Sequence, residues 1–134
     1  MQFDSLIFDM DGTLWDAVSS YAEVWNRVIA QLSIERERVT YDDLVVLMGK
    51  PDDVIFDYII GKDKGIDFKS FMKQLIAKEA EVMPVMGGKL YDGVSRVIPE
   101  LAKKYQLFMV SNCSAAGINN FLKFTGLTPY IKDS

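Results

Sequence analysis

Two kinds of hydrophobic pattern divide the 134-residue chain. Continuous apolar runs at Phe3 to Asp9 and Leu107 to Ser111 are typical of parallel strands that are covered on both faces, and Tyr130-Ile131 is predicted to begin a third strand. Between the first two runs, apolar residues recur at helical spacing from residue 14 to about residue 85. The pattern predicts an α/β fold, a Rossmann-like parallel sheet with a right-handed crossover, interrupted by an inserted helical module.

Capping signals divide the insert into four helices. The residues expected at their starts are Asp16, Thr40 with Asp43 as a capping box, Pro51 and Asp67. Pro84 and Gly87-Gly88 are expected to end the last of these helices and to form a linker. Asp92 and Ser114 are expected to cap two helices of the second α/β segment. The predicted domains are therefore a core of residues 1–13 and 86–134 and a helical module of residues 14–85.

Chemistry-bearing side chains follow both apolar runs. Asp9 and Asp11 are two residues apart, so in extended backbone they point to the same side, with carboxylates roughly 6–7 Å apart. That gap can hold a phosphorus atom, and Gly12 allows the backbone to turn in where a side chain would block it. Ser111 and Asn112 follow the later run, and open parallel sheets bind ligands beyond the carboxyl ends of their strands. The two motifs are therefore predicted to share one site.

The amino-acid composition excludes several classes of function. The net charge of −4 and the pI of about 4.8 do not suit binding to nucleic acid, which requires clustered Lys and Arg. One cysteine excludes an internal disulfide, and the absence of histidine excludes Ser–His and Cys–His nucleophile pairs. No apolar run reaches 18 residues, so no membrane span is expected. We expect a cytoplasmic protein.

These motifs resemble those of haloacid dehalogenase-like hydrolases. The segments concerned are Asp9-Met10-Asp11-Gly12-Thr13-Leu14 and Val110-Ser111-Asn112, and the helical insert is similar to the cap of phosphoglycolate phosphatases and β-phosphoglucomutases. The resemblance implies that Asp9 is a nucleophile that forms an aspartyl-phosphate and that Asp11 is the general acid and base. It also implies Mg²⁺ bound by the Asp9 carboxylate and the Asp11 carbonyl, and phosphoryl oxygens held by Ser111 and Asn112. The implied activity is a Mg²⁺-dependent phosphatase of a small phosphorylated metabolite, or alternatively a phosphomutase.

Three other residues are candidates for the phosphate site. Gly12 and Thr13 lie in the first motif, although Thr13 could equally form only a local hydrogen bond. Lys50 lies where related caps reach into the active site, and it could contact a substrate phosphate or carboxylate or remain a solvated loop lysine. Trp15 and Cys113 are interpreted as packed residues.

The resemblance stops before two later motifs of the family. These are a lysine that bridges nucleophile and phosphate, and an acidic pair that completes the magnesium site; Lys123, Lys132 and Asp133 do not match their contexts. We therefore expect an N-terminal part of the family pattern, truncated before these motifs. An alternative function is a weakly active or non-catalytic remnant that binds phosphate or a partner chain. The first strand would then have an unpaired edge, which predicts a homodimer or a swapped oligomer.

Overall fold

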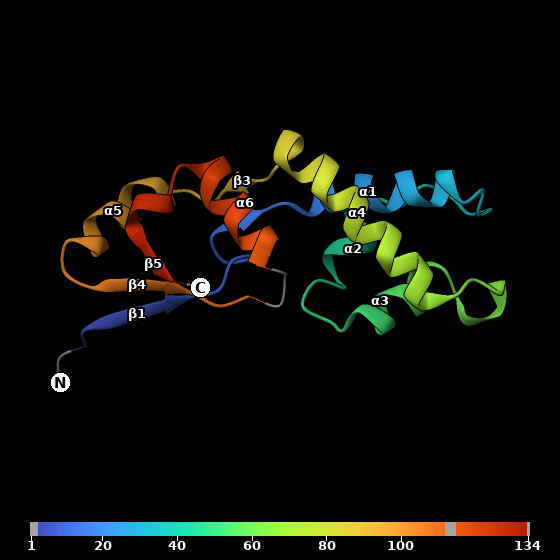
Figure 1. The fold of residues 1–134 in the computed structure, drawn as a ribbon, viewed down its shortest axis with the longest axis horizontal. Helices are drawn as coiled ribbons and strands as arrows, with labels where there is room; N and C mark the ends of the chain where they lie inside the picture. The colour runs from blue at the N-terminus through green and yellow to red at the C-terminus, as the bar shows by residue number, and fades with distance from the viewer. Residues whose placement is uncertain (1–2, 112–114, 134) are drawn as a thin grey trace. The chain divides into compact units, whose positions relative to one another are not determined.

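A computed structural model describes residues 3–111 and 115–133, and the chain in it forms two compact units (Figure 1). The α/β unit comprises Met1–Ala17 and Gly87–Ser134, and the helical unit comprises Val18–Met86. The sequence pattern placed these boundaries at residues 13/14 and 85/86. The first boundary lies later in the structure because Trp15–Asp16 form a short strand, β2, instead of beginning the insert.

A three-stranded parallel sheet is the centre of the α/β unit. Its strands are β1 (Ser5–Phe8), β4 (Gln106–Met109) and β5 (Ile131–Asp133), in the order β1-β4-β5. In the β1–β4 register, Phe8 is the partner of Met109, and the Val110 N–H continues the pairing by donating to the Phe8 carbonyl at 2.9 Å. The predicted α/β class with a parallel sheet is confirmed, and the third strand forms where it was expected.

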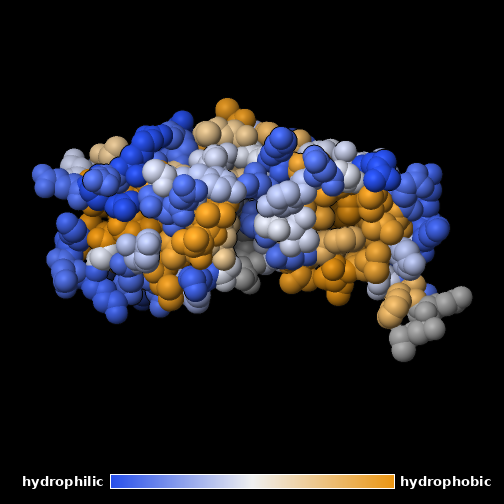
Figure 2. Space-filling model, turned by 180° about the vertical axis from the view of Figure 1, so that it is seen from behind, coloured by the Kyte–Doolittle hydropathy of each residue, from blue (hydrophilic) through white to orange (hydrophobic). Residues whose placement is uncertain are grey.

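Helices α5 (Val94–Ala102) and α6 (Ala115–Thr125) lie on one side of this sheet (Figure 1). Leu107 and Met109 of β4 are fully buried, as is Phe121 of α6. On the alternate positions of the strands, Ile7 is 68% exposed and Phe108 is half-buried. Only one face of the sheet is therefore covered within the described part of this unit, although both apolar runs are typical of strands that are covered twice. Figure 2 shows exposed apolar surface on the half of the view that holds this unit.

Strand β1 also lies at an edge of the described sheet, and an exposed strand edge is a template for pairing with another chain. We expect the chain to self-associate through β1, so its mass in light scattering should rise with concentration. Ile7→Lys should shift this association to at least about tenfold higher concentration, because a charge on the exposed face opposes apolar contact. Tyr58→Lys, at a similarly exposed apolar position in the helical unit, is the control. A monomer at every concentration, or equal effects of both variants, would contradict the expectation.

A second sheet, of two antiparallel strands, joins the chain segment before the helical unit to the chain segment after it. Strand β2 pairs with β3 (Lys89–Leu90), so that Trp15 is opposite Leu90 and Asp16 is opposite Lys89. The Tyr91 N–H extends this ladder by donating to the Leu14 carbonyl at 3.0 Å. The chain segments that lead into and out of the helical unit are therefore hydrogen-bonded to each other.

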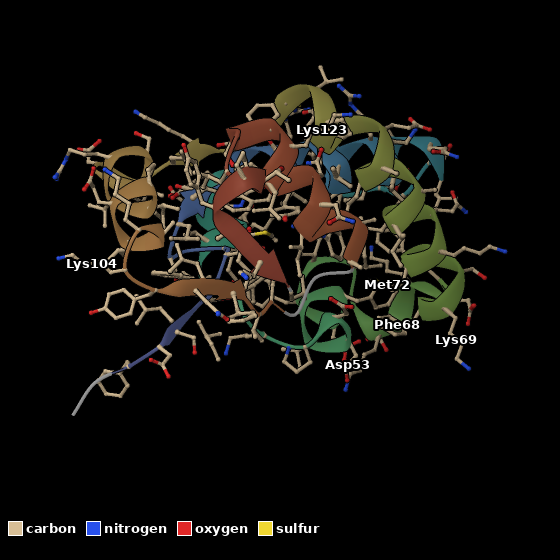
Figure 3. All side chains as sticks on the ribbon, turned by 60° about the vertical axis from the view of Figure 1, so that its left-hand side comes forward. Asp53, Phe68, Lys69, Met72, Lys104 and Lys123 are labelled. Atoms are coloured by element: carbon tan, nitrogen blue, oxygen red, sulfur yellow. The ribbon has the colours of Figure 1, made fainter. Side chains whose placement is uncertain are left out.

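The helical unit is built around its first and last helices. Helices α1 (Val18–Gln31) and α4 (Phe68–Met86) pack against each other, and α2 (Tyr41–Val45) and α3 (Asp52–Ile59) complete the unit. Its core contains an aromatic cluster in which Phe71 contacts Trp25 and Phe56, with ring centroids 5.1 and 5.3 Å apart. Phe56 also packs edge-on against Phe68, which is labelled in Figure 3.

Two predicted helix caps are confirmed by hydrogen bonds. Thr40 Oγ1 accepts from the Asp43 N–H at 3.2 Å, while Asp43 Oδ2 accepts from the Thr40 N–H at 3.0 Å, which is a complete capping box. Asp67 Oδ2 accepts from the Ser70 hydroxyl at 2.8 Å and from the Ser70 N–H at 3.0 Å. These hydrogen bonds favour the ionised carboxylate and lower the pKa of Asp67 below its ordinary value.

One predicted helix boundary was wrong and another was correct only in part. Pro84 lies inside α4, but the helix ends at Met86, directly before the predicted Gly87-Gly88 linker. A proline inside a helix removes one backbone hydrogen bond, and packing of the buried Val82 and Met83 offsets this cost. Asp92 does not cap α5, because Gly93 occupies the N-cap with a positive φ of 88°. Ser114 lies outside the described residues. No helix of the described chain is long and apolar enough to cross a membrane.

Candidate active site

The end of β1 turns sharply through residues 9–15. The Met10 carbonyl accepts N–H groups from Thr13, Leu14 and Trp15 at 3.3, 2.9 and 3.4 Å, which closes a single helical turn. Gly12 has a φ of 77°, and a Cβ built there would meet no atom within 4 Å. Glycine is therefore required at this position by its backbone angle and not by lack of space.

Asp9 and Asp11 are more exposed than Met10, the residue between them. Met10 is fully buried, whereas Asp9 is exposed and Asp11 is half-buried. Alternation along extended backbone explains the difference, because Met10 points into the core and its two neighbours point away from it. The local fold thus presents both carboxylates at the carboxyl end of β1.

Hydrogen bonds hold the Asp9 carboxylate at both oxygens. Oδ1 accepts from the Met10 N–H at 2.9 Å, and Oδ2 is 3.5 Å from the Thr13 hydroxyl, which is a long contact. Thr13 therefore contacts the predicted nucleophile within its own turn. This is the local role that was one of the two predicted for Thr13, and it leaves the phosphate-binding role a prediction.

The second motif follows the neighbouring strand. Because Phe8 is paired with Met109, Asp9 and Val110 are each the first residue after a paired strand end, and Ser111 comes next. Ser111 is half-buried at the same edge of the sheet as the carboxylates. The other half of the motif, Asn112, lies outside the described residues, as does Cys113.

Lys50, a candidate for the phosphate site, and Lys123, which does not match the bridging lysine, lie in different units of the chain. Lys50 is exposed in the turn between α2 and α3 of the helical unit, where its N–H donates to the Leu47 carbonyl at 3.1 Å. Lys123 is exposed in the last turn of α6. Lys123 is labelled in Figure 3. Eight residues of helix separate it from Ala115, which is roughly 12 Å along the helix axis.

One contact was not predicted from the sequence. The Trp15 indole Nε1–H donates to Asp11 Oδ1 at 2.9 Å. The side chain was interpreted only as a packed residue, and it is indeed 99% buried, with 1% exposed. The four-residue separation in a sharp turn was the available signal, because a single helical turn brings residues i and i+4 together.

Oxygen ligands for a hard cation are present but few. Among the described residues, no group of three or more His, Cys, Asp or Glu side chains could hold a metal. Asp9 and Asp11 nevertheless fit Mg²⁺, which usually binds proteins through one or two carboxylates and completes its shell with water and phosphate. The exposure of the Asp9 carboxylate leaves room for such ligands.

Comparison with known protein families matches residues 6–133 to the haloacid dehalogenase-like hydrolases. The chain belongs to this family. The match extends over both motifs and the helical insert between them. A comparison with curated proteins gives no match.

Solved structures agree with this assignment at the level of the fold. A structure described as a predicted phosphoglycolate phosphatase of Haemophilus somnus matches 99% of the chain with a TM-score of 0.82 and 21% identity. A predicted phosphatase of Clostridium acetobutylicum matches 99% with a TM-score of 0.74 and 18% identity. The hydrolase YfnB of Bacillus subtilis, described as bound to magnesium, matches 99% with a TM-score of 0.68 and 20% identity.

The chain spans only part of these relatives. It covers 62% of the Haemophilus protein, 60% of the Clostridium protein and 64% of YfnB. The family is established for this chain by the match over residues 6–133, while hydrolase activity is carried over only as a proposal.

Proposed function

We propose that the chain acts as a Mg²⁺-dependent phosphomonoester hydrolase in which Asp9 is the nucleophile and Asp11 is the general acid. The observation that supports this most directly is the turn after β1, which fixes Asp9 and presents Asp11 beside it at the carboxyl end of the sheet. Relatives described as phosphatases, and one described as bound to magnesium, are consistent with it. The substrate class is a small phosphorylated metabolite.

The reaction would proceed through a covalent intermediate. One Asp9 carboxylate oxygen attacks phosphorus, the bond from phosphorus to the ester oxygen breaks, and Asp11 gives its proton to that leaving oxygen. Asp11 then accepts a proton from water, whose oxygen attacks the aspartyl-phosphate and releases inorganic phosphate and free Asp9. Ser111 would donate a hydrogen bond to the phosphoryl oxygens. Bound Mg²⁺ would offset the negative charges of Asp9 and the phosphate.

A second candidate is a chain that binds phosphate with little or no turnover. It is supported by the small number of charged ligands, since no group of three or more His, Cys, Asp or Glu side chains that could hold a metal is found among the described residues. Electrostatic stabilisation is usually a large part of catalysis, so a site without the bridging lysine should lose orders of magnitude in rate.

Metal removal separates these possibilities. We expect p-nitrophenyl phosphate turnover to fall at least about 100-fold with EDTA and to return with added Mg²⁺, because uncompensated charge opposes the attack. Calcium should restore less activity than Mg²⁺, since Ca²⁺ prefers more oxygen ligands at longer metal–oxygen distances than Mg²⁺ does. Turnover that is insensitive to EDTA would contradict the proposal, and phosphate binding without turnover would favour the second candidate. Product analysis with sugar phosphates distinguishes a phosphomutase.

A further inference from the structure

Trp15 forms hydrogen bonds to the turn of residues 9–15 through both its indole and its backbone. Nε1–H donates to Asp11 Oδ1 at 2.9 Å, the Trp15 carbonyl accepts from the Gly12 N–H at 3.0 Å, and β2 pairs it with Leu90. Residues 11 and 15 also form an isolated β-bridge. The indole and the carboxylate therefore belong to the same hydrogen-bonded turn.

Packing fixes the ring from several sides. Its centroid is 4.9 Å from that of Phe121 and 6.1 Å from that of Phe124, both in edge-on geometry. A Cβ added at Gly88 would lie 2.8 Å from Trp15 Cε3, so the backbone just before β3 approaches the ring closely. A ring held in this way can serve as a rigid donor, because it has little rotamer freedom to lose when it forms the hydrogen bond.

A general acid needs such a support. Its oxygen must be held within about 0.5 Å of the productive position, which a free aspartate side chain with two rotatable bonds does not achieve. The two oxygens of a carboxyl group share a plane with its carbon, so fixing Oδ1 restricts the direction of Oδ2 as well. A buried donor at 2.9 Å is at the ideal length for this purpose.

We propose that Trp15 is a positioning residue that orients the Asp11 carboxyl group for proton transfer to the leaving oxygen of the substrate. This inference rests on the proposed function for its catalytic consequence, while the hydrogen bond itself can be tested without turnover. Trp25, the second tryptophan, packs in the helical unit against Phe71 and is 5% exposed, so it offers a matched control.

The first experiment follows the indole N–H groups in ¹H–¹⁵N spectra. Trp15→Phe and Trp25→Phe each remove one signal and so assign both. In Asp11→Ala, we expect the Trp15 N–H to shift and to exchange with solvent at least about tenfold faster, because the N–H loses the carboxylate that accepts its hydrogen bond. In Asp9→Asn, the same signal should stay in place. An unchanged Trp15 signal in Asp11→Ala would overturn the proposal.

The second experiment uses leaving groups of different acidity. A poor leaving group, an alkyl phosphate, depends on the general acid, whereas p-nitrophenyl phosphate depends on it little. Trp15→Phe should lower kcat for the alkyl phosphate about 10- to 100-fold at unchanged KM, and for p-nitrophenyl phosphate less than about threefold. Trp25→Phe should lower neither selectively.

Equal losses on both substrates in Trp15→Phe would show a merely structural role and would overturn the proposal. If the unaltered chain turns over neither phosphate, the proposed function fails, and the exchange of the Trp15 N–H alone decides whether the indole holds Asp11.

Discussion

Asp9→Asn should abolish phosphatase turnover, with a loss of at least about 10³-fold in kcat. An amide oxygen is a poor nucleophile toward phosphorus and cannot form the acyl-phosphate, while the amide is nearly the same size as the carboxylate. Asn can still accept from the Met10 N–H, which now donates to Asp9 Oδ1 at 2.9 Å, so the turn should keep its shape. The measurement is steady-state hydrolysis of p-nitrophenyl phosphate with Mg²⁺ present, beside a circular dichroism melt.

Asp4→Asn is the matched control for this change. Asp4 precedes the same strand at its amino end, it is exposed, and its substitution removes the same charge. Its turnover should remain within about twofold of the unaltered chain. Turnover that survives in Asp9→Asn would show that another group attacks phosphorus, and it would refute the aspartyl-phosphate route.

Phe121→Ala should destabilise the α/β unit by about 3–5 kcal/mol. Phe121 is fully buried and its ring lies edge-on to Trp15, so truncation leaves a cavity beneath the residue that contacts Asp11. A loss of this size is a large part of the 5–15 kcal/mol by which typical domains are stable. Because the chain has two units, each needs its own probe. Urea unfolding followed by Trp15 fluorescence, in a Trp25→Phe background, reports on the α/β unit.

Phe124→Ala is the companion variant. Phe124 also contacts Trp15 but is 42% exposed, so its truncation should cost only about 1 kcal/mol. The reverse background, Trp15→Phe with Trp25 as the probe, should show little effect of Phe121→Ala on the helical unit. Equal costs for the two phenylalanines would contradict the expectation that the deeper burial of Phe121 makes it the more stabilising residue.

The parts of the fold that depend on periodicity and side-chain chemistry were predictable from the sequence. The apolar runs gave the parallel strands, and the Thr40–Asp43 spacing gave a capping box that the structure contains. Pro84 and Asp92 were misassigned because tertiary packing stabilises α4 past a proline and because a left-handed Gly93 begins α5. Local propensity does not include either effect.

The candidate site was predictable to a similar extent. Alternation placed Asp9 and Asp11 on one side of Met10, and the strand order placed Ser111 at the same sheet edge. The contact of Trp15 with Asp11 was missed, because its one sequence signal, the four-residue separation, depends on a tight turn after β1 that the apolar pattern does not predict. The catalytic roles of Asp9 and Asp11 stay predictions, as do the phosphate-binding roles of Ser111, Asn112 and Lys50.

The pairing of β2 with β3 has a consequence for how such a protein can be assembled from parts. Asp16 and Lys89 are partners across this ladder, and paired strands bring their Cα atoms to about 5 Å from each other. The two ends of the helical unit therefore leave the α/β unit from nearly the same point. An insertion whose two ends lie close together can be deleted and replaced by a linker of a few residues. A different domain with closely spaced ends can also be inserted there without distorting the sheet. We therefore expect that the helical unit can be replaced while the α/β unit keeps its fold.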